Sequence, residues 1–150
     1  MTDRAYVEAN RTASAELRAL VEHLTEAELS TDLGGGWTVA VALAHLAFWD
    51  EWHVARWVHA AQEGELAPPA VDAAVTNRAN DALESTWRAL PPRAAVQLML
   101  DAATAADEYT ADLSDASIET ALERGGSRWF ERFHHRRDHI GQIRGALGRG

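Results

Sequence analysis

The chain has 150 residues, a formal net charge of −9, no cysteine and six tryptophans. This length predicts one domain, residues 1–150, with a sizeable core. The lack of cysteine excludes disulfides, thiolate metal ligands and a cysteine nucleophile, and it fits a cytoplasmic location. The acidic charge argues against nucleic acid as a partner. No apolar run is long enough for a membrane span and no signal peptide is recognisable, so we expect no membrane partner.

The first quarter of the chain predicts one long helix and one short turn. Apolar residues recur at helical spacing from a cap at Thr2 or Asp3 to about Leu24. Residues 25–28 have the form of a capping box and predict a short helical turn. The glycines of residues 33–36 then break the chain. No segment of the sequence has the alternation typical of a β-strand, so we expect no strand.

The second predicted helix begins after its cap, Thr38, and runs to about Gln62. At about 100° per residue, one stripe of this helix carries four residues of functional interest. The neighbouring faces are also apolar, which is typical of a helix buried on several sides. The stripe consists of His45, Trp49, Trp52 and Arg56.

Gly64 and the prolines at 68 and 69 end the second helix. A weakly amphipathic helix is predicted from about Asp72 to Leu90, and the third main helix from Pro92 to about Leu113. Residues 115–124 predict a short helix or turn. Four main helices of about 20 residues predict an all-α fold, a four-helix bundle. The connection of 25 to 30 residues between the second and third main helices allows these two to run parallel, because a tight antiparallel pair needs only about 2–8 residues.

The last predicted helix is capped by Ser127 and contains a pair of histidines. His135 and His139 are four residues apart, so their rings lie on one face and can share an ion. A third ligand must come from another element, and His45 is the best donor. We therefore predict a divalent metal on His45, His135 and His139, with an open position for water or substrate. The neighbouring Arg136 and Arg137 are expected at the rim of the bundle.

Four further residues are candidates for a substrate pocket. Trp49 and Trp52 form either one wall of the pocket or part of the core. Arg56 meets either an anionic substrate or a surface carboxylate. Gln142 orients a ligand water or bonds across helices. The carboxylates near the histidines do not identify a general base, so the catalytic residues are unknown.

These motifs resemble a known family. Trp37-Thr-Val-x5-His45-Leu, followed by His135-x3-His139-x-Gly141-Gln142-Ile, is similar to the DinB-like superfamily. The branch with the N-terminal domain of mycothiol-dependent maleylpyruvate isomerases is the most similar. The resemblance implies an up-down-down-up bundle, Zn²⁺ or Ni²⁺ on the three histidines, and a low-molecular-weight thiol such as mycothiol or bacillithiol as cofactor. It also implies a homodimer, for which Trp57 or Trp87 would supply exposed apolar area.

Three functions follow as hypotheses. A metal on three neutral histidines lowers the pKa of a bound thiol or water. Because the chain has no cysteine, the first hypothesis is a metal-dependent thiol transferase acting on a small electrophile, with the thiol supplied by a cofactor. The second is a metal-dependent hydrolase. The third is a non-catalytic metal- or ligand-binding stress-response protein.

Overall fold

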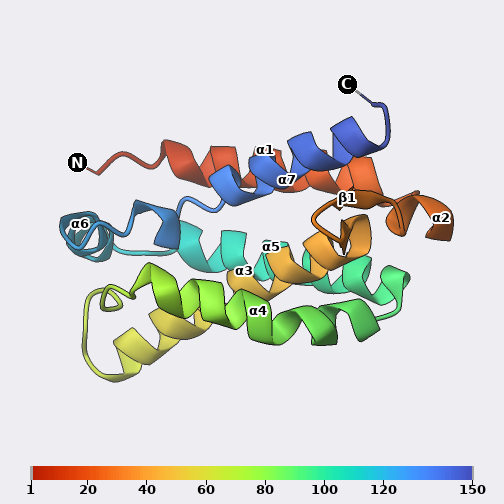
Figure 1. The fold of residues 1–150 in the computed structure, drawn as a ribbon. Helices are drawn as coiled ribbons and strands as arrows, with labels where there is room; N and C mark the ends of the chain where they lie inside the picture. Colours follow the sequence, from red (N-terminus) through yellow and green to blue (C-terminus); the bar gives the residue numbers. More distant parts are fainter. Residues whose placement is uncertain (1, 150) are drawn as a thin grey trace.

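Helices make up nearly all of the regular structure in the computed structural model, which describes residues 2–149. The predicted all-α fold is confirmed, and most of the predicted helices are present. In Figure 1 the long helices lie side by side as a bundle. In chain order the helices are α1 (Ala5–Val21), α2 (Glu26–Leu29), α3 (Val39–Gln62), α4 (Ala73–Ala89), α5 (Pro92–Ala111), α6 (Asp115–Glu123), the short 3₁₀ helix η1 (Ser127–Trp129) and α7 (Phe133–Ala146).

The chain direction in Figure 1 shows how the long connection is used. Helix α3 runs opposite to α1, and α4 brings the chain back along the bundle. Helix α5 then runs in the same direction as α3, and α7 returns beside α1. These directions agree with the up-down-down-up order expected for the four main helices.

The helix starts follow the local sequence. The side chain of Thr38 accepts a hydrogen bond from the Val41 amide at 3.2 Å and so caps α3, as predicted. Thr25 and Glu28 form the predicted capping box of α2. Residues 39–47 of α3 are all buried, and all of them except His45 have small or aliphatic side chains. This end of α3 lies in the main core, where it packs chiefly against α5.

The expectation of no strand is wrong. A two-stranded antiparallel hairpin joins β1 (Asp32–Gly34) to β2 (Trp37–Thr38) directly before α3. Three successive glycines, Gly34 to Gly36, have φ between 63° and 99°, which is a conformation that favours glycine. Strands of two and three residues are too short to show an alternating pattern, so the sequence signals only the turn.

The last helix begins five residues later than predicted. Ser127 opens the 3₁₀ helix η1 without capping it, and α7 starts at Phe133. Three carbonyl groups in this segment accept hydrogen bonds from side chains, and two of these side chains lie far away in the chain. Arg132 Nη1 donates to the Arg128 carbonyl, Trp57 Nε1 to that of Trp129, and Asn10 Nδ2 to that of Phe130. Tertiary contacts thus replace the helical hydrogen bonds that the sequence pattern predicts.

Trp57 and Trp87 are not surface residues. Their side chains are 3% and 5% exposed, so the expectation that they supply apolar area to a dimer is wrong. The homodimer itself stays a prediction. Among residues 2–149, no helix combines the length and apolar character that crossing a membrane requires.

Candidate metal centre

The structure brings the three predicted histidines together. His45 lies on α3, and His135 and His139 lie on successive turns of α7. One ring nitrogen from each residue lies within 4.8 Å of the other two. The ring centroids are 4.8 Å apart for His45–His135, 5.2 Å for His45–His139 and 5.0 Å for His135–His139. The three rings therefore form a nearly equilateral triangle.

Two donor atoms of this triangle already have nearly the spacing that a small divalent ion requires. The Nε2 atoms of His45 and His135 are 2.9 Å apart. Two nitrogens bound tetrahedrally at 2.0–2.1 Å from one ion lie roughly 3.3 Å apart, so this spacing needs little adjustment. The other ring nitrogen of His45, Nδ1, is buried without a hydrogen-bond partner among the described residues. His45 therefore presents Nε2 to the centre of the triangle.

Burial keeps the three rings neutral. Burial, together with a smaller contribution from the charge of His139, lowers the pKa of His45 to about 3. Burial likewise places the pKa of His135 far below its ordinary value. The pKa of His139 is also lowered by burial, against the opposing effect of its hydrogen bond to Gln142. Neutral imidazoles have a free lone pair, which is the form that binds metal.

Gln142 supports one of the three rings. Its Oε1 lies 2.8 Å from Nδ1 of His139. When Nδ1 donates to this carbonyl oxygen, the lone pair of His139 is on Nε2, the other ring nitrogen. Gln142 is exposed and lies outside the cavity beside the histidines. Gln142 therefore contacts a proposed metal ligand, His139, and does not line the cavity.

Three tryptophans surround His45. The ring centroids of Trp37, Trp87 and Trp49 lie 4.8, 5.2 and 6.4 Å from that of His45, each in an edge-on arrangement. The indole of Trp49 donates to Asn80 Oδ1 on α4 at 2.8 Å, which fixes its ring. The site thus has aromatic walls built from β2, α3 and α4.

A cavity of about 300 Å³, the histidine cavity, opens beside His45 and His135. A second cavity of about 240 Å³, the outer cavity, adjoins it. Of the predicted pocket residues, Trp49 lines both cavities, whereas Trp52 and Arg56 line only the outer one. The histidine cavity is lined by His45, Trp49, His53, Thr76, Asn80, Arg128, Glu131, Arg132 and His135.

Arg56 has contacts that the sequence does not predict. Its guanidinium lies 4.6 Å from the ring centre of Trp52 and 4.8 Å from that of Trp129. It also donates to the carbonyl of Pro69. Arg56 therefore joins two aromatic rings to the loop after α3, and no carboxylate pairs with it among the described residues.

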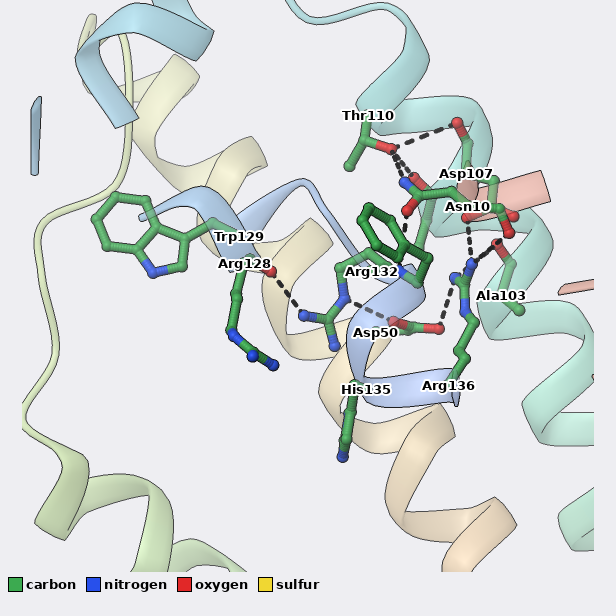
Figure 2. A network of polar contacts seen from close by, with 12 residues as sticks. Asn10, Asp50, Ala103, Asp107, Thr110, Arg128, Trp129, Arg132, His135 and Arg136 are labelled. Carbon is green, nitrogen blue, oxygen red and sulfur yellow. Dashed lines mark hydrogen bonds and ion pairs between the residues drawn. The ribbon is translucent and has the colours of Figure 1, made fainter. Parts of the chain in front are cut away.

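A buried charge network lies next to the histidines (Figure 2). Asp50 on α3 accepts from Arg132 Nε at 2.8 Å and from Arg136 Nη2 at 3.0 Å. Arg136 also donates through Nη1 to Asp107 on α5 at 2.7 Å and to the carbonyl of Asn10 on α1 at 3.0 Å. The arginines flank His135 in the sequence, so the network ties the first turn of α7 to three other helices.

The expectation that Arg136 lies at the rim is wrong, because its side chain is only 1% exposed. The sequence does contain a signal for this burial. Arg136 falls on the apolar stripe of the last helix, and a charged residue on such a stripe needs a buried partner. Its partners, Asp50 and Asp107, are 86 and 29 residues away in the chain, and no local pattern identifies them.

The comparisons with known proteins agree with the geometry. The chain matches the family model described as the mycothiol maleylpyruvate isomerase N-terminal domain over residues 10–138. The matched region includes His45 and His135 and ends one residue before His139. No curated protein and no solved structure gives a significant match. The chain belongs to the mycothiol maleylpyruvate isomerase N-terminal domain family, within the DinB-like superfamily.

Proposed function

We propose that this protein is a metal-dependent enzyme that uses a low-molecular-weight thiol of the mycothiol type on a small electrophile. The observation that carries the proposal is the histidine triangle, with one nitrogen from each residue within 4.8 Å of the others, in a chain without cysteine. His45, His135 and His139 would hold a divalent ion such as Zn²⁺ or Ni²⁺. Bound there, such an ion supplies positive charge that lowers the pKa of a thiol or water in the open position.

The residues of the chain prepare this site for an anionic ligand. Because the three ligand rings are neutral, they add no negative charge that would offset the ion. The lining of the histidine cavity contains one carboxylate, Glu131, and this group is 3.1 Å from Nε2 of His134. The buried ring of Trp49 gives this cavity an apolar wall, which strengthens electrostatic interactions beside it.

The size of the cavities supports a two-part ligand. The histidine cavity of about 300 Å³ is large enough for the reacting end of a thiol together with a small electrophile. The outer cavity, which shares Trp49 and His53 with it, offers space for the rest of a larger thiol. Trp49 is held by Asn80, so it separates these spaces with a fixed surface.

The test is a thiol-transfer assay. Metal-loaded protein is mixed with mycothiol, bacillithiol or glutathione and with an electrophile such as monobromobimane. We expect acceleration over the thiol alone that requires both metal and protein, and its loss in the His139→Ala variant. The control is His59→Ala, which changes an exposed histidine on the same helix as His45.

The other outcomes identify the competing functions. Turnover of an ester or amide without added thiol would identify a hydrolase. If no electrophile reacts faster with any thiol, the proposal is wrong, and a role in metal or ligand binding is the better explanation.

A further inference from the structure

Arg132 is a buried cation at the wall of the histidine cavity. It lies directly before α7, three residues from His135, and its side chain is 4% exposed. It lines the cavity together with His45, His53 and His135. Its positive charge contributes to the lowered pKa of each of these three histidines, which places that charge near all of them.

Two of the three guanidinium nitrogens of Arg132 are already fixed. Nε donates to Asp50 Oδ1 at 2.8 Å, and Nη1 donates to the carbonyl of Arg128 at 2.8 Å. Asp50 is itself held through its other oxygen by Arg136. The guanidinium therefore has one orientation, set by these two hydrogen bonds.

The third nitrogen, Nη2, has no acceptor within residues 2–149. It is also absent from the small set of fully buried unpaired nitrogens, to which Nε of Arg136 does belong. Nη2 is therefore accessible to solvent, and Arg132 is one of the residues that line the histidine cavity. In Figure 2 the free end of the Arg132 guanidinium points to the side on which His135 lies. Because Glu131, the one carboxylate in the cavity lining, is directed to His134, no side chain of the cavity occupies Nη2, and this donor is free for a ligand.

We propose that Arg132 is a specificity-determining residue, which donates through Nη2 to an anionic group of the ligand bound beside the histidines. This inference rests on the proposed function and narrows its substrate class to small molecules that carry a carboxylate close to the reacting atom. A guanidinium is always charged and forms strong hydrogen bonds to carboxylate oxygens. Asp50 and the Arg128 carbonyl serve as positioning groups for it.

The experiment compares three small probes on cobalt(II)-loaded protein by visible absorption titration. Mercaptoacetate has a thiol and a carboxylate, 2-mercaptoethanol has only the thiol, and acetate has only the carboxylate. We expect mercaptoacetate to bind at least about 10-fold more tightly than 2-mercaptoethanol, as a charged hydrogen bond in a buried site would give. In Arg132→Gln this preference should disappear, and acetate binding should weaken by a similar factor.

Two further variants keep the result interpretable. Arg132→Lys retains the charge beside Asp50 but has no guanidinium, so the carboxylate preference should fall there too. Arg137→Gln removes one positive charge from an exposed position on α7 and should leave the preference unchanged. Metal content and helical circular dichroism confirm that each protein is folded and loaded.

The outcomes separate this inference from the proposed function. If the carboxylate preference is absent from the unaltered protein, or persists in both Arg132 variants, the inference is wrong. If acetate binding depends on Arg132 while neither thiol binds more tightly than acetate, the anion site stands and the thiol chemistry fails. If thiols bind and react equally well with and without a carboxylate, the proposed function stands and this inference fails.

Discussion

At the scale of single residues, the hydrogen bond between His139 and Gln142 holds the ring of a proposed metal ligand in place. Gln142→Ala removes the acceptor 2.8 Å from Nδ1 and frees the ring to rotate or change tautomer. We expect the affinity for Zn²⁺ or Ni²⁺ to fall by about 10-fold or more, the usual effect of losing such a partner. Competition with a chelating dye measures it. Gln142→Glu keeps an acceptor and should retain most of the affinity; equal affinity in both variants and the unaltered protein would contradict the role.

His53 predicts how the metal-free protein responds to acid. Burial, together with the charges of Arg132 and Arg56, lowers its pKa to about 2 from an ordinary 6.5. Between these values the unfolded chain binds a proton that the folded chain does not. The free energy of unfolding should therefore decrease as the pH falls below 6.5, by up to about 1.4 kcal/mol per pH unit for one group.

The variant His53→Gln should reduce this pH dependence. Urea unfolding of the metal-free protein between about pH 4 and 6 measures the slope of the unfolding free energy. The exposed His59→Gln on the same helix is the matched control and should leave the slope as it was. A slope unaffected by His53→Gln would show that His53 is protonated in the folded protein.

At the scale of elements, α7 is positioned by polar contacts as much as by apolar packing. Its first amide, on Phe133, donates to Asn10 Oδ1 of α1 at 3.0 Å, and no side chain of its own segment caps it. Arg136 then reaches Asp50 on α3 and Asp107 on α5. Of α3 and α5, only α3 carries a proposed ligand, His45. We therefore expect Asp50, but not Asp107, to influence metal binding.

Matched variants separate this role from general stability. Asp50→Asn and Asp107→Asn each leave a buried arginine with a weakened partner, and both should destabilise the fold by about 3–5 kcal/mol. Only Asp50→Asn should also weaken metal binding, by roughly 10-fold, because Asp50 contacts both arginines beside His135. Thermal unfolding and metal titration of each protein measure the two effects. Equal losses of metal affinity would mean that the network acts on stability alone.

At the scale of the whole molecule, local signals in the sequence predict most of the fold. The caps at Thr25 and Thr38, the prolines before α5 and the periodic apolar residues determine most of the helices. The hairpin and the start of α7 could not be predicted in this way. The hairpin strands are shorter than any periodic pattern, and the 3₁₀ segment depends on Asn10 and Trp57, which lie far away in the chain.

The candidate site, like the fold, could be predicted only in part from local patterns. The spacing of His135 and His139 and the buried stripe of His45 predict residues that the fold does bring together. Arg132 and Asp50 have no such spacing, because their pairing exists only after α7 packs on α3. Contact of Trp52, Arg56 and Gln142 with substrate stays a prediction, although two of these residues line the outer cavity.

The separation of the histidines along the chain also determines when in folding a metal can act. His45 and His135 are 90 residues apart, so the full ligand set forms only when the last helix docks onto α3. If that docking follows the transition state, added Zn²⁺ should slow unfolding and leave the refolding rate unchanged, which stopped-flow measurements at increasing metal concentration can resolve. A refolding rate that rises with metal would mean that α7 docks before the barrier. In the first case, bound metal would extend the lifetime of a completed bundle without guiding its assembly.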